Sequence, residues 1–287
     1  MGDIGATNAR FALVEPGSSE IKNIENLKCS DFEDIQSAIK FYLSNHSDLD
    51  IQSACFATAG TVHLDIFKLA NNHWVINKQE VKKTLKGITV KWINDFTAQA
   101  FATTTLSDSE TIVINKGVVE PEKLRLVIGP GTGLGVCGLI MSSSGWLPIA
   151  GEGGHSDFAP NTSLEFEILT LLTKKFGHVA VERILSGPGI MNLYEALCQI
   201  NDTDMIYHSP SEITAAAVNV GSDPIADETI QMFCKIFGSV AGSMALTVGA
   251  LGGVYITSDL VRNFLDIFVA SEFQESFESK GRLQPVL

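Results

Sequence analysis

Residues 124–135 read LRLVIGPGTGLG. An apolar, β-rich run enters this stretch, four of the seven residues from Gly129 to Gly135 are glycine, and the apolar run Leu134–Met141 leaves it. A strand, a tight glycine turn and a second strand form a hairpin whose tip exposes backbone. Because glycine has no Cβ, several N–H groups of such a tip can point at one oxyanion, as in phosphate-binding loops. By itself the stretch is consistent with either an ordinary tight turn or an anion-binding hairpin.

The first ten residues, MGDIGATNAR, repeat this design. Gly2, Gly5 and Thr7 come before the alternating run Ala9–Val14. A single glycine turn would be interpreted as a turn and nothing more, but two glycine and threonine turns in one chain favour a pair of loops that hold phosphate. The sequence therefore predicts two β-hairpins of the same kind.

Length and charge restrict the class of protein. At 287 residues the chain is long enough for a large core and for about two domains. The net charge is −13, and no cluster of Lys and Arg forms a basic face, which argues against a nucleic-acid partner. A nucleotide remains compatible with this charge if backbone N–H groups and a metal ion bind its phosphates.

Cysteine usage and hydropathy indicate a cytoplasmic protein. The five cysteines are scattered and never spaced as Cys-x-x-Cys, so neither a zinc site nor a disulfide framework is indicated. Met1 is followed at once by Gly-Asp, so we expect no signal peptide. The most apolar long stretch, Ile236–Ile256, is interrupted by glycines, and we interpret it as a buried helix followed by a buried strand rather than a membrane span.

The remaining elements predict an α/β fold whose second half is rich in helix. Predicted strands are Ser53–Thr58, Leu64–Leu69, Ile88–Ile93, Thr111–Ile114 and Leu251–Thr257. Predicted helices are one opened by a capping box at residues 30–33, then Phe96–Leu106, Ser163–Phe176, Val179–Leu185, Ile190–Cys198, Ser211–Val218, Asp223–Val248 and Asp259–Ala270. A domain boundary falls between residues 106 and 124 in this interpretation.

Two short motifs carry side chains that could do chemistry. Asp95, in Ile-Asn-Asp-Phe, follows a predicted strand and precedes a predicted helix, so it is either a helix N-cap or a general base at the carboxyl end of a strand. Glu152 and His155 lie three residues apart in a glycine-rich loop. No third ligand stands at metal spacing, which makes a metal site unlikely there, whereas a carboxylate and an imidazole suit the vicinal hydroxyls of a sugar. Glu182 alone would be interpreted as a surface residue.

Together these motifs resemble the bacterial glucokinases over nearly the whole chain. Five segments match that family in order: Gly2–Arg10, Ile93–Phe96, Gly129–Gly135, Gly151–Pro160 and Glu182–Gly189. The resemblance implies two ribonuclease-H-like domains of the actin-like ATPase superfamily around a cleft, with domains at residues 1–106 and 107–287. It also implies ATP-dependent phosphorylation of glucose at the 6-hydroxyl, with Mg²⁺. A homodimer is a possible assembly, since the long apolar helix Asp223–Val248 could serve an interface as readily as a core.

Residue roles follow from the same resemblance. Asp95 would be the general base. The other sugar hydroxyls would be held by Asn94, Glu152, His155 and Glu182. The ATP phosphates would be held by the loops that contain Gly5, Ala6, Thr7 and Asn8 and Gly131, Thr132 and Gly133, with Asp3 positioning Mg²⁺ through water. No residue is expected to bind a metal directly.

The sequence departs from the family pattern at four places. Met1 abuts Gly2 where the family has a strand, Ala6 replaces a glycine, Thr257-Ser258-Asp259 replaces a Gly-Gly pair beside the adenosine, and the family's terminal strand and closing helix do not follow Leu287. We therefore expect the sugar site to be better preserved than the nucleotide site. The alternative function is a catalytically impaired pseudokinase or a sugar-binding regulator. The related ROK regulators carry a cysteine-rich zinc motif, and residues 156–161 contain no cysteine.

Overall fold

The computed structural model describes every residue except 19, 47–48, 61, 70–71, 220 and 222. Contacts divide the chain into two compact units, Met1–Gln99 and Ala100–Leu287. The boundary inferred from the sequence lies slightly later, between residues 106 and 107. Each unit has its own sheet and its own hydrophobic core.

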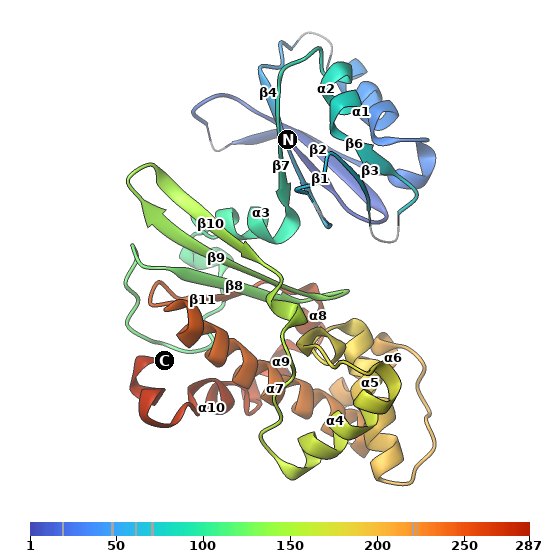
Figure 1. Cartoon of the computed structure of the whole chain (residues 1–287), viewed down its shortest axis with the longest axis vertical. Coiled ribbons are helices and arrows are strands. Elements are labelled where there is room, and N and C mark those ends of the chain that lie inside the picture. The colour runs from blue at the N-terminus through green and yellow to red at the C-terminus, as the bar shows by residue number, and fades with distance from the viewer. Residues whose placement is uncertain (19, 47–48, 61, 70–71, 220, 222) are drawn as a thin grey trace. The chain divides into compact units, whose positions relative to one another are not determined.

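The first unit is built on a five-stranded sheet of order β3-β2-β1-β4-β7 (Figure 1). β1 pairs antiparallel with β2, β2 pairs antiparallel with β3, and β4 lies parallel between β1 and β7. The strands are β1 (Gly2–Ile4), β2 (Asn8–Val14), β3 (Ile21–Lys28), β4 (Ser53–Thr58) and β7 (Thr89–Asn94). A small second sheet pairs β5 (Ile66–Lys68) with β6 (Val75–Asn77).

The second unit repeats this strand order. Its sheet runs β10-β9-β8-β11, with β8, β9 and β10 antiparallel and β11 parallel to β8. The strands are β8 (Arg125–Pro130), β9 (Leu134–Ser142), β10 (Gly145–Gly151) and β11 (Val254–Ile256). In both sheets three antiparallel strands are followed by a strand parallel to the first, so the expected pair of ribonuclease-H-like α/β sheets is confirmed. Both predicted glycine hairpins, β1–β2 and β8–β9, are also confirmed.

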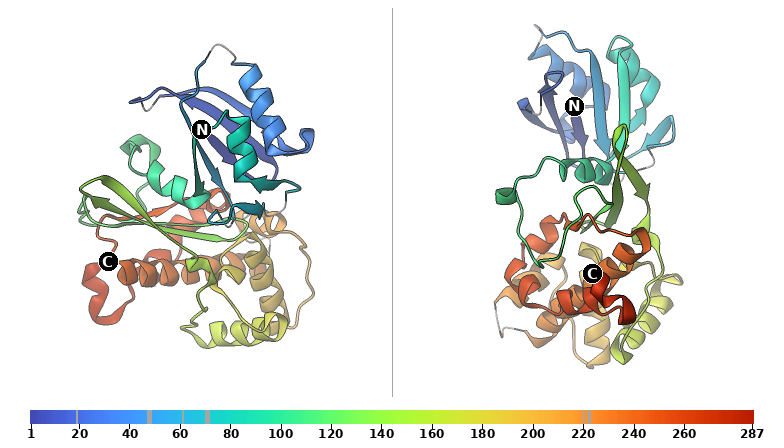
Figure 2. Two further views of the ribbon diagram at one scale, coloured as in Figure 1. Left: turned by 45° about the horizontal axis from the view of Figure 1, so that its top comes forward. Right: turned by 90° about the vertical axis from the view of Figure 1, so that its left-hand side faces the viewer.

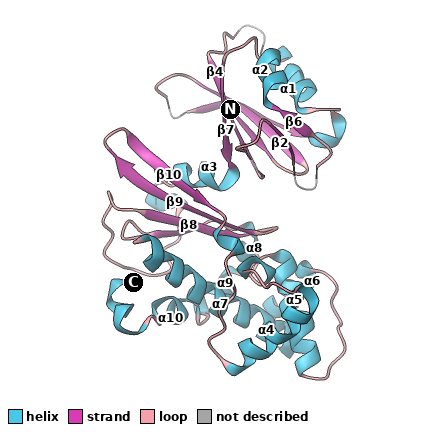
Figure 3. Cartoon of the chain, viewed as in Figure 1, coloured by secondary structure: helices cyan, strands magenta, loops and turns pink. Residues whose placement is uncertain are grey.

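Helices dominate the second unit, as the sequence predicted (Figure 3). In both views of Figure 2 they lie on one side of the sheet. The helices are α4 (Ser163–Phe176), α5 (Gly187–Ile200), α6 (Pro210–Val218), α7 (Pro224–Val248), α8 (Asp259–Arg262), α9 (Leu265–Ala270) and α10 (Phe273–Glu278). Short 3₁₀ turns η1 (Cys29–Asp31), η2 (Asp108–Glu110), η3 (Gly153–His155), η4 (Val181–Arg183) and η5 (Gly281–Val286) connect elements in both units.

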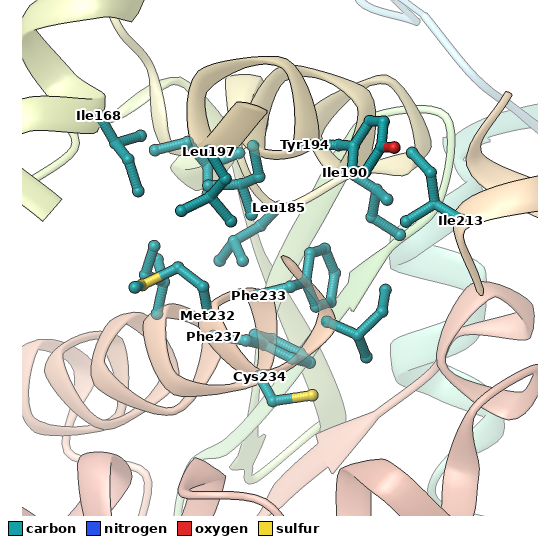
Figure 4. Packing of buried hydrophobic residues seen from close by; sticks show 14 of the residues in the cluster. Ile168, Leu185, Ile190, Tyr194, Leu197, Ile213, Met232, Phe233, Cys234 and Phe237 are labelled. Carbon is teal, nitrogen blue, oxygen red and sulfur yellow. The ribbon is translucent and has the colours of Figure 1, made fainter. Parts of the chain in front are cut away.

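The long helix α7 is the centre of this second core. Phe233 and Phe237 on α7 are fully buried and face Leu185, Ile190 and Tyr194 from the segment around α5 (Figure 4). In the described part of the chain α7 is the one helix long and apolar enough to cross a membrane, yet most of its apolar stretch is buried inside the unit. It is therefore the core helix that the sequence predicted.

The first unit has a separate core under α1 (Ile35–Ser44), with α2 (Lys78–Thr84) beside it. Ile35, Ala38, Ile39 and Tyr42 recur at helical spacing and are all buried. The predicted capping box at residues 30–33 is wrong. α1 begins at Ile35, where Asp34 accepts from the Ser37 N–H and the Ser37 hydroxyl closes a reciprocal box, while residues 29–31 form the separate turn η1.

Three further predictions differ from the structure. No strand forms at residues 111–114, where Ile112 and Val113 are both 65% exposed rather than buried in a sheet. The helix predicted at Val179–Leu185 is reduced to η4, because residue 180 forms an antiparallel bridge with Asp157 and is held extended. The helix predicted at Asp259–Ala270 is split into α8 and α9.

Helix α3 (Asp95–Ala102) follows β7 and contains the boundary between the two units. Just beyond its end, the Thr103 carbonyl accepts a hydrogen bond from Arg125 on β8 at 2.8 Å. The Arg125 guanidinium lies 4.5 Å from the ring centre of Trp146 and 5.5 Å from that of Tyr255. A cation between two aromatic rings is stabilised by both faces, so this arginine fixes the end of α3 to three strands of the sheet.

Candidate active site

Asn94 and Asp95 stand where β7 ends and α3 begins. The Asn94 Oδ1 accepts from the Phe96 N–H at 2.8 Å, which is the hydrogen bond of a helix cap. The Asp95 Oδ1 accepts from the same N–H at 2.9 Å, and Asp95 is itself the first helical residue. Asn94 thus occupies the cap position, and Asp95 presents a carboxylate at the first turn of the helix.

The first glycine turn is fixed by three hydrogen bonds to its backbone. The Gly5 N–H donates to the Asn8 carbonyl at 2.9 Å, and the Thr7 carbonyl accepts from the Cys29 N–H at 2.8 Å. The side chain of Asn72 donates to the Gly5 carbonyl at 3.2 Å. Ala6 is exposed and does not have a positive φ, so its methyl group causes no backbone strain.

Asp3 is the acidic residue next to this turn. It lies on β1, its side chain is 54% exposed, and its Oδ2 lies 3.3 Å from Arg10 Nη1 on β2. Mg²⁺ in nucleotide sites is bound through one or two carboxylates, water and substrate phosphates, so an exposed carboxylate beside a glycine turn would suit that ion. Among the described residues there is no group of three or more His, Cys, Asp or Glu that could hold a metal without such phosphates.

The second glycine loop is tied to two helices. The Gly131 N–H donates to the Gly133 carbonyl and the Gly131 carbonyl accepts from the Gly187 N–H at the start of α5, both at 2.8 Å. The Ser258 hydroxyl donates to the Pro130 carbonyl at 2.6 Å and caps α8 through the Val261 N–H. The sequence pattern identifies Ser258 only as a departure from the family, although a serine three residues before a helical Val is a recognisable cap signal.

Asp259 is the first residue of α8. Its side chain is fully exposed, with Arg262 of the same helix 3.8 Å away. Such an exposed pair contributes little to stability.

His155 and Glu182 lie in two adjacent 3₁₀ turns, and Glu152 lies just before the first of them. Glu152 is exposed and precedes η3, which contains His155, and Glu182 lies in η4. The Val181 N–H donates to the Ser156 carbonyl at 2.8 Å, which fixes the two turns together. As a result His155 Nδ1 lies 3.6 Å from Glu182 Oε1. Gly154 lets this segment approach β9, since a Cβ there would collide with the Leu134 carbonyl.

The structure therefore brings His155 and Glu182 together. In the second unit an imidazole and a carboxylate lie beside a glycine loop, which suits a ligand that carries both hydroxyl groups and phosphate. In the first unit Asn94 and Asp95 stand at the end of β7, and Asp3 stands beside the first glycine turn.

A family model described as Glucokinase matches residues 1–287. The chain is 45% identical to the glucokinase of Hahella chejuensis over 287 residues, which is 100% of this chain and 89% of that protein. The crystal structure of glucokinase from an Antarctic psychrotroph matches with a TM-score of 0.90 at 33% identity, over 99% of this chain and 89% of that chain. A ROK family glucokinase from Streptomyces griseus, solved with glucose and AMPPNP, shares the fold with a TM-score of 0.58 at 16% identity, over 96% of this chain and 87% of that chain.

Proposed function

The chain belongs to the glucokinase family, and we propose that Asp95 is the general base in its reaction. That reaction is the ATP-dependent phosphorylation of glucose at the 6-hydroxyl to give glucose 6-phosphate. The sugar oxygen forms a bond to the γ-phosphorus, the bond from that phosphorus to the ADP oxygen breaks, and Asp95 takes the hydroxyl proton.

The observation that carries the role of Asp95 is the position of Asn94. Because Asn94 supplies the cap hydrogen bond to Phe96 N, the helix start does not depend on the Asp95 carboxylate alone. Asp95 also lies at the carboxyl end of a sheet strand, which is where ligands of α/β proteins bind.

The remaining residues bind and orient the two substrates in this proposal. Asn94, Glu152, His155 and Glu182 hold the other glucose hydroxyls. Backbone N–H groups of Gly5–Thr7, with Asn8, and of Gly131–Gly133 hold the phosphates. Asp3 would position Mg²⁺ through water, and the ion would supply charge neutralisation at the phosphates. Positioning and charge neutralisation supply most of the catalysis in phosphoryl transfer.

The test of the base is Asp95→Asn. We expect kcat to fall at least about a hundredfold, because the variant cannot accept the proton, while the glucose Kd stays within about tenfold. A coupled ADP-release assay measures turnover, and calorimetry measures glucose binding. If kcat is unchanged and only the melting temperature falls, Asp95 is a helix-start residue and the proposal is wrong.

The same assay addresses the pseudokinase alternative, which no comparison favours. The wild-type chain should release ADP in a glucose-dependent manner. Binding of glucose without ADP release would instead support a sugar-binding regulator.

We also propose a cytoplasmic enzyme that acts without nucleic acid or membrane partners. The charge of −13 supports this, since polyanions and anionic lipid surfaces would both repel such a protein. Light scattering would test whether the enzyme is a homodimer.

A further inference from the structure

Glu182 packs directly on the second glycine loop. A Cβ built on Gly133 would lie 2.8 Å from Glu182 Oε2 and 3.8 Å from its Cδ, so the carboxylate fills the space where a side chain at position 133 would start. Gly131, two residues earlier in the same loop, has open space at its Cβ position. The two glycines thus differ in what surrounds them.

The other oxygen of the same carboxylate faces His155. Glu182 Oε1 lies 3.6 Å from His155 Nδ1, and the Glu182 side chain is 25% exposed while that of His155 is 60% exposed. Glu182 is therefore held between the loop backbone on one side and the imidazole on the other, with one edge left for solvent or ligand.

The main chain around Glu182 is fixed as well. Its carbonyl accepts from the Ser186 hydroxyl at 2.7 Å, and Ser186 caps α5. The neighbouring Gly187 N–H bonds the Gly131 carbonyl. Because the backbone cannot retreat easily, any group added at position 133 would displace the carboxylate by rotating its side chain.

We propose that the missing side chain at Gly133 sets the position of the Glu182 carboxylate, so that this glycine of the phosphate loop is a positioning residue for glucose. The inference rests on the proposed role of Glu182 as a glucose ligand. A hydrogen bond from a sugar hydroxyl to a carboxylate holds only over a few tenths of an ångström in distance, and a displaced carboxylate loses it.

The experiment compares two alanine substitutions in the same loop, Gly133→Ala and Gly131→Ala. Neither glycine has a positive φ, so alanine fits the backbone at both positions. Glucose Kd is measured by calorimetry without nucleotide, so that any effect on phosphate binding does not enter. We expect Gly133→Ala to weaken glucose binding about tenfold and Gly131→Ala to change it less than about twofold.

A double-mutant cycle with Glu182→Gln shows whether the effect passes through that side chain. Glu182→Gln should weaken glucose binding by itself, and adding Gly133→Ala should then cost less than it does in the wild type. Melting temperatures of all variants, followed by circular dichroism, should stay within a few degrees of the wild type, because the clash involves the end of a flexible side chain. A large fall in the melting temperature of Gly133→Ala alone would count against the proposal.

The outcomes separate this inference from the proposed function. Equal glucose affinities for Gly133→Ala and Gly131→Ala, or fully additive effects in the cycle, would overturn the role of Gly133 while glucose phosphorylation stands. An unchanged Kd in Glu182→Gln would overturn both the ligand role of Glu182 and this inference. Absence of glucose-dependent ADP release by the wild type would instead contradict the proposed function.

Discussion

At the scale of single residues, local hydrogen bonds decide what a motif residue does. Ala6, which stands where the family has a glycine, does not have a positive φ, and its side chain is exposed. Asp259, which replaces a small residue, faces solvent beside Arg262. Neither departure strains the fold itself, and their effect on nucleotide binding stays a prediction.

A buried tyrosine in the first unit gives a pH-dependent prediction. Tyr42 is 3% exposed, its hydroxyl donates to the Asn23 carbonyl at 2.8 Å, and its ring stacks on Phe11. Burial, and secondly the charge of Glu25, raise the pKa of Tyr42 to about 12. The unfolded chain releases this proton at about pH 10, so the contribution of the tyrosine is fully present below pH 10 and is lost as the pH rises towards about 12.

Tyr42→Phe tests that sign. At pH 8 the variant should be less stable than the wild type by about 1 kcal/mol, because one buried hydrogen bond is lost. Between pH 10 and 11.5 the difference should shrink, since phenylalanine has no proton to release. Urea denaturation at several pH values measures it. A difference that stays constant with pH would show that Tyr42 does not titrate with a raised pKa.

At the scale of elements, small residues set how closely helices approach. Gly238 and Gly242 lie on one side of α7, and a Cβ on either would collide with a carbonyl of α10, that of Phe273 or Phe277. Both α10 phenylalanines belong to or pack against the second core. These two glycines therefore let the α10 backbone rest against α7.

Gly238→Ala should lower the free energy of unfolding by about 1–3 kcal/mol, because the added methyl group meets backbone that must move. Ser243→Ala is the matched control, since Ser243 lies on the exposed side of the same helix. Urea denaturation followed by circular dichroism compares the two. Equal stabilities for the two variants would mean that α10 can shift without cost.

At the scale of the whole molecule, the two hydrophobic cores share no residue. The first core is formed by residues between Ile4 and Trp92, and the second by residues from Ile114 to Phe277. Two of the three tryptophans, Trp74 and Trp92, lie in the first unit, and Trp146 lies in the second. Fluorescence and helical circular dichroism can therefore report on different units.

We expect the units to respond separately to core mutations. In a Trp146→Phe background, fluorescence reports on the first unit alone, whereas the circular dichroism signal comes mainly from the helices of the second. Leu193→Ala, at a fully buried position of α5, should shift the circular dichroism midpoint more than the fluorescence midpoint. The expected loss of stability is about 2–5 kcal/mol. Ile39→Ala, at a buried position of α1, should shift the fluorescence midpoint more than the circular dichroism midpoint. Equal shifts in both signals would indicate one cooperative unit.

The sequence alone determined the α/β class, both glycine hairpins, the helical second half and the family, because these depend on short-range patterns and on motifs in a fixed order. Ser163–Phe176 was predicted to the residue, since a local cap at Thr162 and a glycine after the last turn define both ends. The long apolar helix was correctly assigned to a core for a similar reason, as glycines interrupt its apolar run.

Only the tertiary structure decided the features that depend on partners distant in the chain. Residue 180 is extended because Asp157 pairs with it, and the apolar residues 111–114 are not part of any strand in the described structure. Arg125 packs between Trp146 and Tyr255 only when the three strands that carry these residues, β8, β10 and β11, have assembled. The contact of Glu182 with Gly133 has the same origin, since no spacing rule brings a carboxylate to a glycine in a different loop until the sheet and η4 have packed.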